Sequence, residues 1–175
     1  MPGITIHLAS ANQYLKKHPE ENREEFIRGT IAPDIAKDYN ASHYSKPCNR
    51  DSLEEYLKAK VDIYEAFLDL DLSKAFNRGQ ILHLIMDFEF YNNYFDEDEI
   101  RDLSLEEFRS IMYHDYASLN RHVKEKYEVE FPEEVKDFDI DDSESSIMLE
   151  PTEVDEFIER IGDIEIGEHV GNKGR

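Results

Sequence analysis

The chain has 175 residues, and its formal net charge of −21 at pH 7 argues against nucleic acid and anionic membranes, which proteins bind through Lys and Arg. Hydrophobic residues make up 39% of the chain, enough for one domain with a packed core. No apolar run is as long as a membrane span, and the N-terminal segment lacks the features of a secretory signal. Because Cys48 also has no second cysteine to pair with, we expect a cytoplasmic protein.

The first part of the chain shows helical periodicity followed by a segment without it. An apolar stripe of Ile4, Leu8, Ala11 and Leu15 predicts a first helix. Residues 20–28 predict a short second helix that stops at Gly29. Residues 29–50 contain two prolines and little periodicity, so they predict a long loop.

Two sequence patterns of the capping-box type predict helix starts further along. Ser52 with Glu55 opens one helix, whose apolar side comprises Leu53, Leu57, Tyr64, Phe67 and Leu68. Residues 73–94 predict the next helix, and Ser104 with Glu107 opens another that reaches about residue 127. A last helix is expected over residues 152–161, after Pro151 and before Gly162.

These elements together predict an all-α protein, a single domain of about five to seven helices. Residues 1–127 would form a helical metal-binding core, and residues 128–150 an exposed acidic connector. Residues 151–175 would add a C-terminal helix and a frayed tail that pack on the same domain.

The stretch GQILHLIMDFEF, residues 79–90, is the most informative in the chain. It places His83 and Asp87 one helical turn apart, on one face of an apolar helix. A buried aspartate requires a cation, a hydrogen-bond network or a metal. Gly79 lies one turn earlier and costs about 1 kcal/mol relative to alanine. Close approach of another segment or a ligand would explain it, and so would a simple helix crossing or a helix that begins after Gly79.

Separate segments supply further candidate ligands. His7 lies in the first helix, Asp34 and His43 lie in the predicted loop, and Asp115 falls in an inward-facing helical series. Imidazole and carboxylate groups together suit zinc and similar ions. A His-x-x-x-Asp pair alone is weak support, since most such pairs are surface pairs or hydrogen-bonded core groups. The apolar surroundings and the additional candidates nevertheless indicate a metal site.

The remaining aromatic and histidine residues have less specific interpretations. An aromatic cluster follows Asp87 and would serve either as core or as the lining of a substrate pocket: Phe88, Phe90, Tyr91, Tyr94 and Phe95. His122 is expected to be a core histidine bonded to a backbone carbonyl rather than a ligand. His18 and His169 lie in polar surroundings and are expected to be solvated.

Five short segments, in their order along the chain, resemble the zinc-dependent phospholipase C and single-strand nuclease superfamily, and in particular its small bacterial branch without signal peptides. The segments are MPGITIHLASA, FIRGTIAPDIA, SHY, GQILHLIMDFEF and, more weakly, MYHDYASLN. The resemblance covers about the first two thirds of the chain. It implies an all-α fold that holds zinc ions and hydrolyses phosphate esters.

The resemblance also implies a role for each matching residue. Asp34, His43, His83 and Asp87 would bind one zinc ion. Asp87 would bridge to a second ion, bound also by His7 and by the amino nitrogen of Pro2 after removal of Met1. Asp34 would orient or deprotonate the attacking water, which makes it the candidate catalytic residue.

The family's third zinc ion lacks its ligands in this chain. Asn93 stands where that family has a histidine, and neither His114 with Ser118 nor His122 with Lys126 forms the expected His-x-x-x-Glu pair. Asp115 would substitute only in part, so we expect one or two zinc ions. The sequence thus predicts a zinc-dependent hydrolase of a small phosphate ester, either a phosphodiester or a phospholipid-like molecule.

Two alternatives are also compatible with the sequence. One is a helical interaction protein whose metal site is degenerate or purely structural. The other is a phosphohydrolase of the superfamily named for its His-Asp doublet, for which His114 and Asp115 would supply the doublet.

Overall fold

The computed structural model describes residues 3–46, 52–58, 62–135 and 145–167. Within these ranges the chain forms α-helices and one 3-10 helix, and no strand, which confirms the all-α prediction. The elements are α1 (Ile4–Lys17), α2 (Arg23–Ile35), α3 (Tyr39–Ser42), α4 (Leu53–Lys58), α5 (Ile63–Asp69), α6 (Ala75–Asn93), α7 (Glu97–Ile100), α8 (Leu105–Lys126), η1 (Glu133–Val135) and α9 (Pro151–Gly162). Short helices such as α3 and α7 account for a larger number of elements than the sequence predicts.

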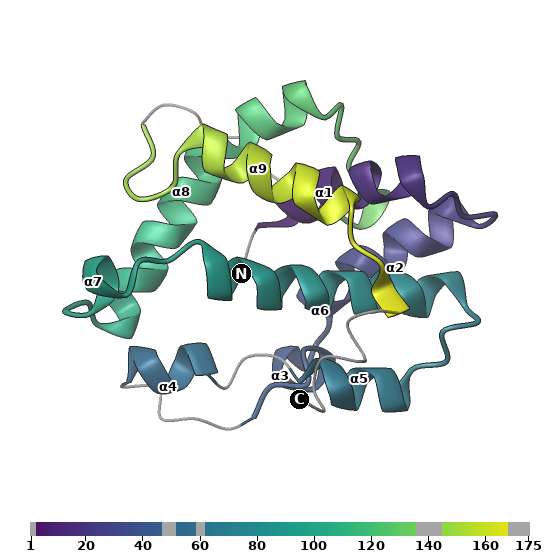
Figure 1. Cartoon of the computed structure of the whole chain (residues 1–175), viewed down its shortest axis with the longest axis horizontal. Helices are drawn as coiled ribbons and strands as arrows, with labels where there is room; N and C mark the ends of the chain where they lie inside the picture. Colours follow the sequence, from purple (N-terminus) through teal and green to yellow (C-terminus); the bar gives the residue numbers. More distant parts are fainter. Residues whose placement is uncertain (1–2, 47–51, 59–61, 136–144, 168–175) are drawn as a thin grey trace.

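Helix α6 occupies the centre of the fold (Figure 1). Helices α1 and α9 pack against each other on one side of it, and α3, α4 and α5 lie on the other. Helix α2 makes the most extensive contact with α6. The apolar part of α6 is fully buried at Ile81, Leu82, Leu84, Ile85, Met86 and Phe90, which explains why hydrophobic residues surround His83 and Asp87 in the sequence.

Two glycines allow α2 and α6 to cross at very short range. A Cβ atom on Gly79 would lie 2.1 Å from the carbonyl oxygen of Phe26, and a Cβ on Gly29 would lie 1.9 Å from that of Phe76. Real Cβ atoms essentially never come closer than 3.0 Å to another atom. Gly79 lies inside α6, and the close approach of α2 explains it. Of the alternatives, a helix crossing therefore holds, and a helix that begins after Gly79 does not.

The predicted loop over residues 29–50 is the main error of the sequence analysis. Helix α2 continues through Gly29 to Ile35 and includes Pro33 in its last turn. The glycine packs against α6 instead of ending the helix. Pro33 lacks the N–H that would donate to the Gly29 carbonyl, so α2 loses that one hydrogen bond but continues for two more residues. Asp34 is thus presented from a helix, and His43 is the C-terminal cap of α3.

The helix predicted to start at Ser52 is also shorter than expected. The Ser52 hydroxyl accepts a hydrogen bond from the Glu55 N–H at 3.2 Å, as a capping residue should. The chain then forms two separate helices, α4 and α5, in place of the single predicted one. Leu68 is 67% exposed and does not belong to a buried apolar face.

The later helices match their predictions closely. Ser104 and Glu107 form a complete capping box at the start of α8, whose C-terminal cap is Tyr127. Helix α9 begins with Pro151 and ends at Gly162, and its apolar face packs against α1. The predicted frayed tail beyond residue 167 and residues 136–144 of the acidic connector lie outside the described residues. The described parts of the connector are not wholly exposed as predicted, because Val129, Val135 and Leu149 are buried.

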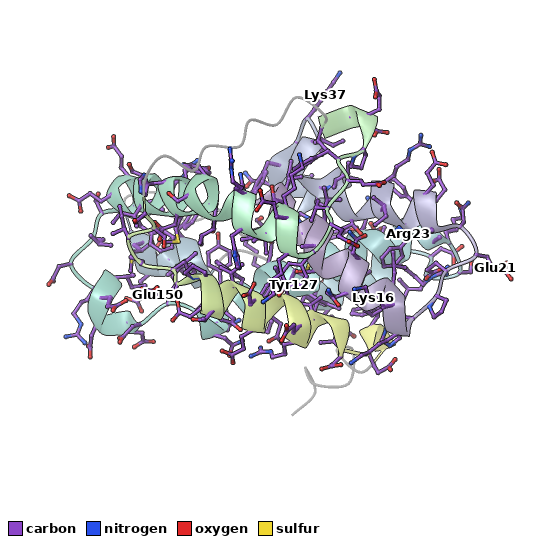
Figure 2. The ribbon with its side chains drawn as sticks, turned by 90° about the horizontal axis from the view of Figure 1, so that it is seen from above. Lys16, Glu21, Arg23, Lys37, Tyr127 and Glu150 are labelled. Atoms are coloured by element: carbon purple, nitrogen blue, oxygen red, sulfur yellow. The ribbon has the colours of Figure 1, made fainter. Side chains whose placement is uncertain are left out.

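Charged side chains cover the outside of the helices, with Lys37 and Glu21 projecting from different parts of the molecule (Figure 2). None of the helices in the described ranges combines the length and the hydropathy needed to cross a lipid bilayer.

Candidate metal centre

Five of the predicted ligands converge on one point of the core. His7 comes from α1, Asp34 from α2, His43 from the end of α3, and His83 and Asp87 from α6. All but one are fully buried, with side-chain exposures of 2% or less; the Asp34 side chain is 15% exposed. Segments up to 80 residues apart in sequence thus bring three imidazoles and two carboxylates together.

Four of these side chains point their donor atoms at one another. His43 Nε2 lies 3.2 Å from His83 Nε2. The Asp34 Oδ1 atom lies 3.2 Å from the first of these nitrogens and 3.4 Å from the second. The corresponding distances from Asp87 Oδ2 are 3.5 and 3.4 Å. Each imidazole nitrogen therefore faces the other nitrogen and one oxygen from each aspartate.

His7 extends the group on the other side of Asp87. Its Nε2 atom lies 3.0 Å from Asp87 Oδ1, so the two carboxylate oxygens of Asp87 face different histidines. The His7 ring stacks on the His83 ring, with centroids 3.9 Å apart and planes within 3°. The carbonyl of Gly3 lies 3.2 Å from His7 Nδ1 and holds the ring at the start of α1.

Backbone carbonyls orient the two facing imidazoles. Thr30 O lies 2.7 Å from His83 Nδ1, and Tyr39 O lies 2.8 Å from His43 Nδ1. A carbonyl oxygen only accepts hydrogen bonds, so each Nδ1 carries the proton and donates it. In a neutral imidazole this leaves the Nε2 lone pair directed into the group, as found for histidines that bind metals.

The two carboxylates strongly favour a positive charge close to them. Burial alone would raise the pKa of Asp34 and of Asp87, but the charge of His83 holds both pKa values below their usual range. Burial likewise opposes protonation of His83, yet the two carboxylates raise its pKa to about 10. For His7, burial and the neighbouring His83 lower the pKa. The two carboxylates therefore favour a positive charge at this point of the core.

One buried oxygen is left without a hydrogen bond. Asp87 Oδ2 is inaccessible to water and, among the described residues, has no hydrogen-bond partner; His83 Nε2 and His43 Nε2 lie 3.4 and 3.5 Å away. An unsatisfied buried oxygen is costly for a carboxylate. Asp87 belongs to a group whose donors lie within 4.8 Å of one another as two overlapping triads, His7–His83–Asp87 and Asp34–His43–His83. The donor types, their burial and the unsatisfied oxygen fit a metal ion, so this group could hold one.

The remaining candidate ligands lie elsewhere or outside the described residues. The Asp115 carboxylate accepts hydrogen bonds from the N–H groups of Ile147, Met148 and Leu149 at 2.6, 2.7 and 2.9 Å, so it anchors the segment that leads into α9. Pro2 is among the residues that the structure does not describe.

The other polar residues that the sequence singles out have local partners. Asn93 bonds to Glu89 on its own helix. His114 bonds to the carbonyl oxygen of Ser145. His122 bonds to the Asp155 carboxylate at 2.9 Å, in place of the expected backbone carbonyl. His18, expected to be solvated, is only 21% exposed and bonds to Glu165.

The aromatic cluster that follows Asp87 divides between two roles. Phe90 is fully buried in the core. Phe88, Tyr91 and Phe95 line a cavity of about 700 Å³ between α4, α6 and α7.

The sequence analysis missed two residues at the candidate metal centre, because neither is a metal ligand. The Tyr39 ring stacks on His43 with centroids 3.8 Å apart, and the Thr30 carbonyl orients His83.

Comparisons with protein-family models, with curated protein sequences and with solved structures found no match to this chain. Any functional assignment therefore depends on the chemistry and the geometry of the five converging side chains.

Proposed function

We propose that the group binds a zinc ion through Asp34, His43, His83 and Asp87. Ligands at 2.0–2.1 Å from a tetrahedral zinc ion lie about 3.3–3.4 Å from one another. The distances from the two imidazole nitrogens to each other and to the two carboxylate oxygens are 3.2–3.5 Å. Five of the six distances within the set of four donors therefore agree with a tetrahedral site, and this agreement is the single observation that carries the proposal.

A second ion at His7 is the next part of the proposal. His7 Nε2 and Asp87 Oδ1 lie 3.0 Å apart, so Asp87 would bridge two ions if Oδ1 also bound one. His83 completes a triad with these two donors, but its Nε2 atom is already assigned to the first ion. The amino group of Pro2, exposed by removal of Met1, is the proposed third donor, in keeping with the resemblance to the zinc-dependent phospholipase C superfamily.

The activity that this site supports best is hydrolysis of a phosphate ester. With four protein ligands, a zinc ion here would need a fifth coordination position for water; it would then acidify that water and stabilise negative charge on phosphate oxygens. Asp34 is the only one of the five side chains with more than marginal exposure, so it lies on the side from which water and substrate would arrive. Its Oδ1 atom faces the histidines, which leaves Oδ2 to orient the water and accept its proton.

The order of the ligands along the chain supports the likeness to the zinc-dependent phospholipase C fold. A histidine from the first helix, an aspartate and a histidine from the next segments, and a His-x-x-x-Asp pair on a central helix meet at one point. This is the arrangement that the resemblance implies for its first two zinc ions.

Metal analysis of purified variants tests the metal site. Wild-type protein is expected to carry at least one zinc ion per chain, and His83→Ala and Asp87→Asn should each lose most of it. His114→Ala removes a histidine from α8 that bonds to the Ser145 carbonyl, so it should keep its zinc and serves as the matched control. Full zinc content in His83→Ala would refute the site.

Activity is tested separately, on the zinc-loaded protein. Bis-(p-nitrophenyl) phosphate and p-nitrophenyl phosphate are suitable general substrates. Turnover that chelation abolishes and zinc restores would support the hydrolase, and Asp34→Asn should then lower kcat by about 100-fold or more, as loss of a general base does.

A structural metal site is the second candidate function, because four protein donors complete a tetrahedral coordination shell and leave no open position. The protein would then be a helical interaction protein in which zinc joins α2, α3 and α6. Stoichiometric zinc without turnover of either substrate would favour this candidate.

A further inference from the structure

Tyr39 supplies no ligand atom to the candidate metal centre, but it is held against one of the ligands. Its ring stacks on the His43 imidazole, with centroids 3.8 Å apart and the two planes at 21°. Its carbonyl oxygen accepts a hydrogen bond from His43 Nδ1 at 2.8 Å. The Ser42 hydroxyl donates to the Pro33 carbonyl oxygen at 2.9 Å, which ties α3 to the last turn of α2. Tyr39 therefore has a defined position relative to His43 and Asp34.

The hydroxyl of Tyr39 is not explained by these contacts. The residue as a whole is partly exposed, but the hydroxyl oxygen is inaccessible to water and makes no hydrogen bond to any of the described residues. Buried tyrosine hydroxyls normally have a partner, and one without a partner requires an explanation. A phenylalanine ring would stack on His43 equally well, so the stacking does not account for the hydroxyl.

The Tyr39 hydroxyl lies near the two carboxylates of the centre. Burial, and then the charges of Asp87 and Asp34, raise the pKa of Tyr39, so the hydroxyl is close enough for both charges to act on it. Neither carboxylate accepts its hydrogen bond. Each aspartate instead directs one oxygen at the Nε2 atoms of His43 and His83, at 3.2–3.5 Å. The hydroxyl therefore remains available to a group that binds beside these ligands.

The chemistry of a phenol suits it to donate to an anionic oxygen. A tyrosine hydroxyl has an ordinary pKa of about 10, so it carries its proton at neutral pH and acts as a hydrogen-bond donor, not as a base. A phosphate group at the proposed zinc site would carry negative charge on its oxygens. A fixed donor beside that group would strengthen its binding and would stabilise the charge that develops during hydrolysis.

We propose that the Tyr39 hydroxyl donates a hydrogen bond to an oxygen of the phosphate group while that group is bound at the zinc ion. Tyr39 is then a second catalytic residue, with a role different from that of Asp34, which accepts a proton from the attacking water. This inference rests on the proposed function, since it adds a substrate contact to the proposed hydrolase.

Calorimetric titration of the zinc-loaded protein with inorganic phosphate tests the contact apart from turnover. Tyr39→Phe removes only the hydroxyl, and it should weaken phosphate binding about tenfold because a hydrogen bond to a charged group is lost. Tyr94→Phe is the matched control. Among the described residues the Tyr94 hydroxyl is likewise buried without a partner, but its ring packs on Phe90 and Phe157 in the core. Its phosphate affinity should equal that of the wild type.

Zinc affinity and stability distinguish the hydroxyl from the ring. Tyr39→Phe keeps the stack on His43, so its zinc affinity and the Tm of its zinc-loaded form should match those of the wild type. Tyr39→Leu removes the ring and should lower zinc affinity, because His43 is held less firmly. If Tyr39→Phe lost as much zinc affinity as Tyr39→Leu, the role of Tyr39 would be structural and the inference would be overturned.

Turnover of bis-(p-nitrophenyl) phosphate separates this inference from the proposed function. In an active protein, Tyr39→Phe should lower kcat about tenfold or more, whereas Tyr94→Phe should keep the wild-type kcat. Wild-type phosphate affinity in Tyr39→Phe, or no phosphate binding by the zinc-loaded wild type, would overturn the inference even if the protein is a hydrolase. Weaker phosphate binding in Tyr39→Phe together with absent turnover in the wild type would uphold the contact and reject the hydrolase.

Discussion

Replacing Gly79 with alanine tests the packing that brings α2 and α6 together, and with it the candidate metal centre. The new Cβ would lie 2.1 Å from the Phe26 carbonyl oxygen and 2.8 Å from the Thr30 nitrogen. Both are backbone atoms of α2, so no side chain can move aside. Ordinary contact begins at 3.4 Å, and α2 must therefore move away by roughly 1.3 Å at this point.

The energetic effect has two opposing parts. Overpacking of this kind costs about 3 kcal/mol, and alanine recovers about 1 kcal/mol of helix propensity. The net loss of about 2 kcal/mol corresponds to a fall in Tm of about 4–8 °C for a domain of this size. Gly167→Ala is the control, because a Cβ at Gly167 meets nothing within 4 Å.

The same displacement should weaken the proposed metal binding. The Thr30 carbonyl orients His83, and Asp34 lies one turn further along α2, so both would move relative to α6. A shift of about 1 Å is large compared with the ±0.2 Å that zinc ligand distances tolerate. We expect zinc affinity to fall at least tenfold in a competition assay with a chromophoric chelator. Unchanged Tm and zinc affinity in Gly79→Ala would refute the described helix crossing.

Two further predictions concern buried or half-buried carboxylates on α8 and α9. Asp115→Asn should destabilise the protein by about 2–4 kcal/mol, because it disrupts the hydrogen bonds to three backbone N–H groups, and the urea midpoint should show this. Its zinc content should stay unchanged, whereas a loss of zinc would restore Asp115 to the ligand set. For Asp155, burial opposes ionisation but hydrogen bonds from Lys126, His122 and Tyr127 lower the pKa below its ordinary value. Its stabilising effect is therefore present above about pH 4 and lost as the pH falls through the lower, folded-state value. The stability difference between the wild type and Asp155→Asn should stay constant from pH 6.5 to about pH 4 and narrow as the pH falls further. A difference that does not narrow below about pH 4 would contradict this assignment.

Local sequence patterns were sufficient to predict the helices whose ends are set by residues at those ends. At the start of α8, the side chains of Ser104 and Glu107 each accept a hydrogen bond from the other residue's backbone N–H. Pro151 lies in the first turn of α9, where a backbone N–H has no helical acceptor, so the missing N–H of proline costs no hydrogen bond. These interactions operate within a few residues, so they can be recognised without knowing the rest of the fold.

The extent of α2 depended on tertiary contact. Gly29 is a plausible helix stop when judged alone, but it lies mid-helix because α6 approaches it more closely than any side chain would permit. Nothing within residues 20–35 contains that information, since the partner helix begins at Ala75.

The sequence by itself determined the helical class, the main amphipathic helices and the residue types suited to a metal site. His83 and Asp87 could be paired in advance because one helical turn places them on the same face. The family resemblance named His7, Asp34 and His43 as their partners, but periodicity and spacing could not, and only the tertiary structure brings these donors together. The packing of α1, α2 and α3 around α6 brings His7, Asp34 and His43 to that face. The Asp115 carboxylate instead accepts hydrogen bonds from the backbone N–H groups of residues 147–149. The physical reason is that helix periodicity specifies neighbours along one helix, while neighbours on different helices depend on how their surfaces fit together.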